Sequence, residues 1–527
     1  MVLRTKFRIA LLYLFLGTNT YSGSILELWF RVWNIVFVGI RALFCKFCFL
    51  IKEGGGPKNR RLRTGFSMKI PLSKNSKIFY LVFCVPFILA FLSWMYFPIL
   101  AQWIVAQIFG YELVEQAVNW VWYVAIRVFY SWYTFLAIGV AGAWAIAAMF
   151  ARKKRVKPER HYYPMVSFVV PAYNQEKNVS RCITSLFRCT EKYDGPCEII
   201  VVDDGSGDYT YEVAWSTMEF NRRRYPQVRG KVVRHSVNLG KVEALKTGVN
   251  KALGSIVAIV DADSEWMPNT LVKLVDYKLS HGKKAVTGYV HPSADGDASY
   301  LYVVLQQLEY SQGLGVGRCA QSLGDKVLVV SGAIGLYDAD LLRDILTEKS
   351  IRSVTEDLEI TLEMHKRGAK VGYVGVAASS TVVPTSFGLL WNQRLRWFTG
   401  WLHNTLGIHR DLLLKKSWLT LVLWYCYIFE YVGAFVDLAA LFAFPFLFWF
   451  APDCVFFAFN LLVFVPYGFL IGVVNQAIAL KYAYGKRDYY DLLFYTPFYP
   501  FLRLINILAR SRSTVGYLLG DNGKWHK

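Results

Sequence analysis

Apolar residues gather at the two ends of the chain and leave a mixed segment between them. The apolar stretches 78–100 and 118–150 are long enough for transmembrane helices, since a bilayer core needs about 20 helical residues. They predict a hairpin over residues 78–150 that leaves the cytoplasm and returns to it. Residues 1–77 form an apolar and basic N-terminal extension. Within it, residues 7–51 are apolar but contain several basic side chains, so they form either a short helical hairpin or interfacial helices.

The middle segment, residues 160–385, alternates between short β-rich runs and helix-length stretches. The runs are MVSFVVP, CEIIVVD, KVVRH, SIVAIVD and KAVTGYV. The stretches between them predict helices that begin near Glu176, Asp208, Lys241 and Pro268. Strands that alternate with helices predict a parallel, doubly wound sheet in an α/β domain.

After residue 385 the pattern becomes helical. Residues 386–415 place Trp, Leu and Phe beside Arg and Gln, as in an amphipathic helix at a membrane surface. Residues 416–527 predict a C-terminal transmembrane region with a basic tail, and their apolar stretches are 418–450, 454–480 and 489–509. In the first stretch, Glu430 and Asp437 share a helix face and either line a channel or pair with membrane arginines.

The composition fits a membrane protein. Of the 527 residues, 54% are hydrophobic, and the net charge is +21. The basic residues cluster beside the apolar stretches and no nucleic-acid motif accompanies them, so they predict cytoplasmic loops and exclude nucleic acid as a partner. Cys182, Cys189 and Cys197 fall in the middle segment, which we place in a reducing compartment. We therefore expect a multi-pass protein of the cell membrane with a cytoplasmic middle domain.

Polar motifs follow the predicted strands. In VDADS, Asp261 and Asp263 lie at the end of a strand, where open α/β sheets bind ligands. Two carboxylates at this spacing can hold a hard divalent cation that also binds phosphate oxygens. Lys241 in NLGKVEAL begins a predicted helix, so both its charge and the helix dipole favour a phosphate. The other motifs, in chain order, are PAYNQEKNV, VVDDGSGD, TEDLEITLEMHKRG and QRLRW.

Together these ordered motifs resemble those of membrane-embedded family 2 glycosyltransferases, over roughly residues 160–400. The chain is most similar to the processive synthases of hyaluronan, poly-N-acetylglucosamine, chitin and cellulose type. The resemblance implies a Rossmann-like α/β domain of the GT-A fold, cytoplasmic and inserted between N- and C-terminal transmembrane helices. It also implies a hexosyltransferase that moves a sugar from a nucleotide-sugar, most simply a UDP-sugar, to a growing glycan. The transfer would be inverting, dependent on Mg²⁺ or Mn²⁺, processive and coupled to export through the bilayer.

The resemblance assigns roles to individual residues. Asp357 becomes the general base, with Glu356 beside it; the alternative is a helix N-cap box that begins at Thr355. The metal ligands are Asp263 and Asp261. The donor-binding residues are Tyr173, Asp203, Asp204, Lys241, Asp261, Gln393 and Arg396, and the acceptor-binding residues are Trp397, Ser331 and Gly332.

Several alternatives remain open from the sequence. Asp203 or Asp204 could instead cap the following helix, and Trp397 could anchor its helix at the membrane interface. For the whole protein, the first alternative is a non-processive enzyme that adds one sugar to a lipid acceptor. The second is a non-catalytic membrane protein that binds carbohydrate, against which the intact Asp263, Asp357 and Arg396 argue. The sequence does not identify the sugar.

Overall fold

The computed structural model describes six stretches of the chain, together with Trp103 and Gln107; the stretches are 139–153, 163–294, 300–349, 351–439, 465–484 and 490–520. The chain divides into two units, Met1–Pro71 and Leu72–Lys527, and all described residues belong to the second unit. The predicted extension at 1–77, the predicted span at 78–100 and most of the span at 118–150 lie outside the described residues.

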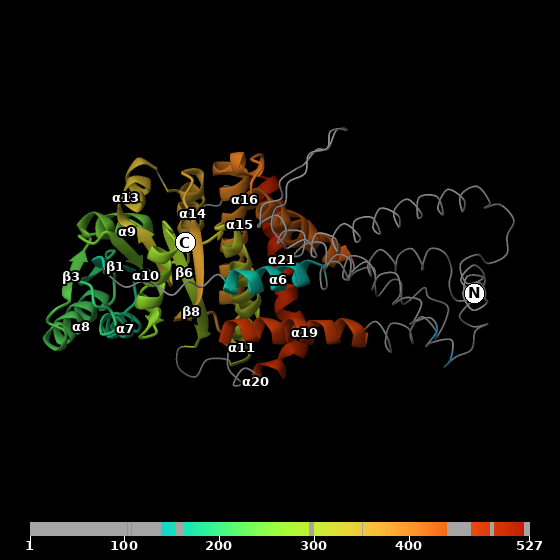
Figure 1. Cartoon of the computed structure of the whole chain (residues 1–527), viewed down its shortest axis with the longest axis horizontal. Helices are drawn as coiled ribbons and strands as arrows, with labels where there is room; N and C mark the ends of the chain where they lie inside the picture. Colours follow the sequence, from blue (N-terminus) through green and yellow to red (C-terminus); the bar gives the residue numbers. More distant parts are fainter. Residues whose placement is uncertain are drawn as a thin grey trace, which may run out of the picture. The chain divides into compact units, whose positions relative to one another are not determined.

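An eight-stranded sheet forms the centre of the described structure, with the strand order β3-β2-β1-β4-β7-β6-β8-β5 (Figure 1). Its strands are β1 (Val166–Ala172), β2 (Cys197–Asp203), β3 (Arg229–Arg234), β4 (Ile256–Ile259), β5 (Ser264–Trp266), β6 (Ala285–Ser293), β7 (Gly335–Asp338) and β8 (Val371–Val382). The residues of β1, β2 and β4 are all buried, as expected for strands that are covered on both faces.

The prediction of a wholly parallel sheet is wrong, because the sheet is mixed. Strands β3, β2, β1 and β4 pair in parallel, as their alternation with helices predicts. Strand β7, which lies within the motif SGAIGLY, then inserts antiparallel between β4 and β6. The short strand β5 pairs antiparallel with β8 at the far edge. A Rossmann-like parallel half therefore continues into an antiparallel half, and VDADS lies where the two halves meet.

Helices cover both faces of the sheet. Apolar residues of α7 (Val179–Thr190), α8 (Thr210–Arg224) and α10 (Thr270–Ser280) share one core with alternate residues of β1 and β2. Those of α9 (Lys241–Lys251), α13 (Ala339–Glu348) and α14 (Glu356–Lys366) share a second core with the opposite residues of the same strands. Helices α7 to α10 begin within three residues of their predicted starts.

A group of helices packs beside the sheet (Figure 1). It contains α6 (Ala141–Lys153), α11 (Tyr300–Tyr310), α12 (Cys319–Gln321), α15 (Phe387–Leu402), α16 (Trp418–Tyr425), α19 (Val465–Tyr484), α20 (Tyr490–Leu493) and α21 (Tyr499–Leu518). The π-helical segments in this part of the chain are η2 (Ser311–Arg318), η4 (His403–Ile408) and η6 (Cys426–Val432), and the 3₁₀ segments are η3 (Ser322–Gly324), η5 (Arg410–Leu413) and η9 (Thr496–Phe498).

Two of the described helices are long and apolar enough to cross a membrane. Trp418–Ala439 has a mean hydropathy of 1.6, and Asp491–Leu518 has a mean hydropathy of 1.3. They overlap the first and third apolar stretches predicted for the C-terminal region. Pro497 and Pro500 are the second residues of η9 and α21, in the first turn of each, where proline is tolerated. By themselves, two such helices are weak evidence of a membrane protein.

Candidate active site

Lys241 joins the carboxylates of two motifs that are far apart in the sequence. Its ammonium group lies 2.7 Å from a carboxylate oxygen of Asp261 and 2.7 Å from one of Glu356. Burial disfavours the charged ammonium, but the charges of Asp261 and Glu356 outweigh this effect and raise the pKa of Lys241 well above its ordinary value. The lysine therefore stays protonated and fixes the end of β4 against the start of α14.

The loop before Lys241 is held by Asp204. The Asp204 carboxylate accepts hydrogen bonds from the backbone N–H groups of Leu239 (3.0 Å) and Gly240 (2.7 Å), and it lies 2.7 Å from Nδ1 of His235. Gly240 has a φ of 93°, which a residue with a side chain adopts only with strain, so this glycine allows the turn into α9. Asp204 thus positions Lys241 through the backbone of the loop.

Asp203 is the last residue of β2 and is fully buried. It lies 3.2 Å from the guanidinium Nε of Arg234 and accepts a hydrogen bond from the N–H of Ser206. Helix α8 begins after Tyr209, and no side chain of that N-cap residue bonds the helix end. The helix-capping alternative for Asp203 and Asp204 is therefore wrong.

Tyr173 follows β1 with 44% of its surface exposed.

Asp263 lies two residues beyond Asp261 and is half-buried. One of its carboxylate oxygens accepts hydrogen bonds from the hydroxyls of Thr381 and Ser264, each at 3.2 Å. Burial, followed by the charge of Asp261, raises the pKa of Asp263 to about 6. The two carboxylates thus create a negative charge that their own surroundings do not fully neutralise.

Asp261 is also in close contact with Gly332 of SGAIGLY. The N–H of Asp261 donates to the Gly332 carbonyl at 2.9 Å, and a methyl group on Gly332 would lie 2.8 Å from the Asp261 carboxylate. Ser331 donates its N–H to the Thr287 hydroxyl at 3.3 Å and is half-buried. The structure therefore brings this loop, predicted to bind acceptor, beside the D-x-D motif.

Glu356 and Asp357 begin helix α14. Burial and then the neighbouring charge of Glu356 raise the pKa of Asp357 to about 6, while Lys241 opposes the shift. The Thr355 side chain makes no cap bond to the helix, so the capping-box alternative for this motif is wrong. Its hydroxyl instead accepts a hydrogen bond from Asn404 at 3.0 Å. Asp357 is a half-buried carboxylate whose pKa lies near the range in which a general base works well.

Asn404 is a site residue that sequence reasoning missed. It is fully buried at the end of the QRLRW helix, and its amide also donates to the Ser353 hydroxyl at 2.8 Å. A methyl group on Gly400 of α15 would lie 2.4 Å from the Thr355 hydroxyl, so α15 packs closely on the loop before α14. The α15–η4 segment therefore positions the turn that carries Asp357.

The QRLRW residues divide between two environments. Trp397 is half-buried, its ring lies 6.4 Å from that of Tyr310, and the Arg394 guanidinium lies 4.4 Å from its centroid. Arg394 is fully buried and pairs with Glu309 at 2.5 Å. Arg396 is exposed, and Gln393 is half-buried.

Glu430 and Asp437 pair with arginines, which is one of the two alternatives left by the sequence. Glu430 lies 2.6 Å from Arg510, and Asp437 lies 2.9 Å from Arg503. The Arg510 guanidinium also covers the ring of Phe398, at 4.3 Å from its centroid. Phe398 follows Trp397 directly, so the ion pair between Glu430 and Arg510 contacts the helix of the QRLRW motif.

The residues at the D-x-D motif fit a divalent cation. Asp261 and Asp263 supply hard oxygen ligands, and the raised pKa of Asp263 indicates an incompletely neutralised charge. Within the described part of the chain, no group of three His, Cys, Asp or Glu side chains could hold a metal ion. A cation at this place would therefore need further ligands, such as phosphate oxygens of a substrate, which is the way Mg²⁺ is commonly bound.

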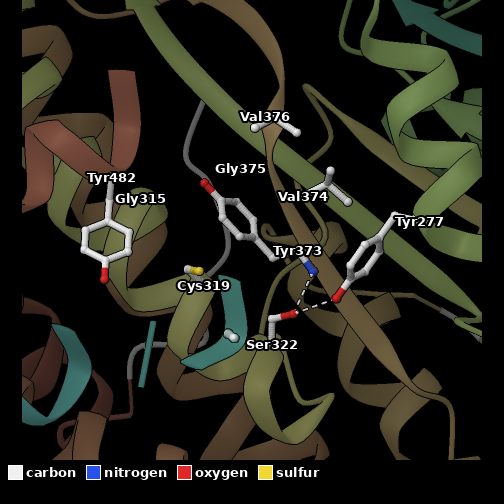
Figure 2. A pocket seen from close by; sticks show the side chains of 10 residues that line it. Tyr277, Gly315, Cys319, Ser322, Tyr373, Val374, Gly375, Val376 and Tyr482 are labelled. Atoms are coloured by element: carbon white, nitrogen blue, oxygen red, sulfur yellow. Dashed lines mark hydrogen bonds between the residues drawn. The ribbon is translucent and has the colours of Figure 1, made fainter. Parts of the chain in front are cut away.

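A small pocket lies behind η2, outside the residues predicted for the site (Figure 2). Its lining includes Gly315, Cys319, Tyr373 and Tyr482, and its volume is about 40 Å³. The Ser322 hydroxyl accepts a hydrogen bond from the backbone N–H of Tyr373 at 3.3 Å. A volume of this size has room for little more than one water molecule, so the pocket is too small for a sugar.

Residues 164–400 match the protein-family model that is described as glycosyltransferase like family 2. Over these residues the chain is similar to the family 2 glycosyltransferases. This match confirms the resemblance drawn from the motifs over that part of the chain. The matched residues include all eight strands of the mixed, Rossmann-like sheet.

Similar curated proteins are named polysaccharide synthases. The poly-β-1,6-N-acetyl-D-glucosamine synthase of Staphylococcus epidermidis is 29% identical over 275 residues, which are 52% of this chain and 61% of that protein. The protein of the same name from Staphylococcus aureus strain COL is 27% identical over 237 residues, which are 45% of this chain and 54% of that protein. The match therefore spans little more than half the length of these relatives.

Two solved structures show weaker similarity. A mannosyltransferase from Pyrobaculum calidifontis, in complex with GDP-Man and Mn²⁺, is 19% identical with a TM-score of 0.44, covering 73% of this chain and 96% of that one. Residues 1–349 of TarS from S. aureus are 16% identical with a TM-score of 0.32, covering 69% of this chain and 93% of that one. Both TM-scores are below 0.5, so the family assignment depends on the sequence match alone.

Proposed function

We propose that this chain transfers a sugar from a UDP-sugar to the end of a growing glycan, with inversion at the anomeric carbon. The observation that carries the proposal is the bridge made by Lys241 between Asp261 and Glu356. It brings the D-x-D motif, which suits a diphosphate, next to Asp357, which suits an acceptor hydroxyl. Direct transfer requires the donor and the acceptor to be held next to each other.

In this proposal, Asp357 accepts the proton of the acceptor hydroxyl as the hydroxyl oxygen attacks the anomeric carbon of the donor. The bond from that carbon to the diphosphate oxygen breaks, and the UDP leaves with the electron pair. A general base typically contributes about 10²–10⁴-fold to such a step. Lys241 is already protonated and remains close to the developing charge on the diphosphate.

Asp263 and Asp261 would hold Mg²⁺ or Mn²⁺, which supplies neutralisation of the diphosphate when bound. Tyr173 is exposed beside the end of β1 and can cover the nucleotide base. Asp204 contributes by holding the loop that carries Lys241, and Asp203 by its pair with Arg234. Gln393 and Arg396 belong to the donor side, and Trp397, Ser331 and Gly332 to the acceptor side.

We further propose that the enzyme is processive and passes its product through the cell membrane, with the catalytic domain in the cytoplasm. The two apolar helices Trp418–Ala439 and Asp491–Leu518 support a membrane location, and the names of the similar synthases support a polymer as product. The proposed domain boundaries are 1–77, 78–150, 160–385, 386–415 and 416–527. The apolar C-terminal part would then surround the path of the glycan.

The test uses the purified full-length chain in detergent or lipid nanodiscs. It is incubated with a panel of UDP- and GDP-sugars, with EDTA or with added Mg²⁺ or Mn²⁺, and nucleotide release and product length are measured. We expect release from one UDP-sugar, loss of release in EDTA, recovery with metal, and a long product on a gel. A single added sugar on a lipid would support the non-processive alternative, and absence of nucleotide release from every donor would refute catalysis.

A further inference from the structure

Arg318 is a charged residue beside the site that no motif predicts. It ends η2, the π-helical segment that continues α11. Tyr310, at the end of α11, lies with its ring 6.4 Å from Trp397. π-Helical turns are rare and frequently occur at functional sites. The π-helical segment therefore connects the aromatic pair of Tyr310 and Trp397 with Arg318.

The surroundings of the Arg318 guanidinium are aromatic on several sides. Its charge interacts with Tyr373, Asp357, Tyr310 and Tyr337, and burial lowers its pKa from the ordinary value. Arg318 therefore lies near both the proposed base, Asp357, and Tyr310, which is the aromatic neighbour of Trp397.

The hydrogen-bonding groups of Arg318 are incompletely used. Its Nη1 atom is buried and has no hydrogen-bond partner among the described residues. Arg367, by comparison, pairs with both Glu348 and Glu363. A buried N–H group without a partner is costly, so an unsatisfied guanidinium beside a catalytic carboxylate requires an explanation. The explanation that fits this place is a substrate that supplies the missing acceptor atoms.

We propose that Arg318 is an acceptor-binding residue whose free N–H groups donate hydrogen bonds to oxygen atoms of the terminal sugar of the glycan. A guanidinium has five N–H donors and no acceptor, and the hydroxyl, ring and carbonyl oxygens of a sugar are suitable partners. With one face of the sugar on Trp397, these bonds fix the rotation of the ring and direct one hydroxyl toward Asp357. This inference rests on the proposed function.

The experiment compares full-length wild-type protein with Arg318→Gln and Arg318→Lys. For each protein we would measure kcat and KM for a soluble oligosaccharide acceptor, KM for the UDP-sugar, UDP release to water, UDP affinity and melting temperature. Arg318→Gln should raise the acceptor KM about tenfold or more, as expected for loss of charge-assisted hydrogen bonds. Arg318→Lys should raise it less. The donor KM and UDP release to water should stay within about twofold of wild type.

Arg343→Gln is the matched control, because Arg343 pairs with Asp340 on the surface of α13, and it should leave every parameter unchanged. If Arg318→Gln does not fold, Arg318→Lys decides the case. An unchanged acceptor KM in a folded variant overturns the inference. Parallel loss of UDP release to water and of transfer also overturns it, since Arg318 would then act on Asp357 or on the donor. Wild-type protein that releases no UDP refutes the proposed function itself.

Discussion

Asp263 and Asp357 have similar raised pKa values but different proposed roles, and a pair of substitutions separates them. Asp263→Asn and Asp357→Asn should each lower turnover by at least about 10²-fold. Asp263→Asn should also lose metal-dependent affinity for UDP-sugar, whereas Asp357→Asn should keep it, because a base is needed only in the chemical step. Isothermal titration with donor and Mn²⁺ measures the difference. Equal loss of donor affinity in both variants would reject Asp357 as the base.

The same two substitutions, which should lower turnover, should raise the stability of the folded protein. The folded-state pKa of each carboxyl is about 6, which is above the unfolded value of about 3.9. The folded state therefore holds the proton more tightly than the unfolded state does. The free energy of unfolding then falls as pH rises from about 4 to about 6 and stays lower above that range. At pH 8, without metal or donor, Asp263→Asn and Asp357→Asn should therefore melt at higher temperature than wild type. A lower melting temperature in both would contradict the raised pKa values.

The pKa of Asp357 also predicts the pH dependence of transfer. Because the base must be ionised, kcat at saturating donor and metal should fall about tenfold per pH unit below pH 6 and level off above it. Glu356→Gln removes a neighbouring charge that raises this pKa, so the acidic limb should move to lower pH in that variant. Measurement of kcat from pH 4.5 to 8.5 tests both expectations. A limb that stays in place in Glu356→Gln would show that burial alone sets the pKa.

At the scale of elements, helix α15 supports the turn before α14. Asn404, in the η4 segment that continues α15, donates to Ser353 and Thr355 of this turn. Asn404→Ala should therefore lower kcat by about tenfold or more, because a small displacement of Asp357 is costly in rate. The donor affinity should remain unchanged. Thr399→Ala, on the same helix, is a control; similar losses in both variants would indicate a general effect on α15.

The strands and helices also show which parts of the fold and the site can be predicted from the sequence. Strands β1 to β4 are short apolar or β-rich runs that alternate with the helix-length stretches of α7 to α10, and these elements correspond to their predicted positions. Strand β7 is four residues long, and it inserts antiparallel because it pairs with β4 and β6. The local sequence of a strand does not indicate such pairings. The motifs identify Lys241 and Glu356 separately, but they lie more than one hundred positions apart, so only the fold reveals their contact. Arg318 and Asn404 belong to no motif, and a single polar residue in an apolar helix gives no signal of its role.

At the scale of the whole molecule, two ion pairs connect the helical segment Trp418–Ala439 with α21. Arg510 pairs with Glu430 and covers Phe398 of α15, and only 17% of its side chain is exposed. Arg503 pairs with Asp437, and 50% of its side chain is exposed. The first pair therefore links both apolar helices to the QRLRW motif, whereas the second joins only the two helices.

This difference yields a matched comparison. Arg510→Gln leaves Glu430 without its arginine and removes the contact with Phe398, and it should lower stability by about 1–3 kcal/mol. Arg503→Gln leaves Asp437, whose side chain is only 9% exposed, without its arginine and should lower stability by a similar amount. If α21 supports the position of Trp397, Arg510→Gln should also shorten the glycan product while UDP release to water persists. Melting temperature, product length on a gel and UDP release, measured on both purified variants, test the expectation. Equal effects of the two substitutions on product length would mean that the Arg510 contact with α15 has no special part in holding the acceptor.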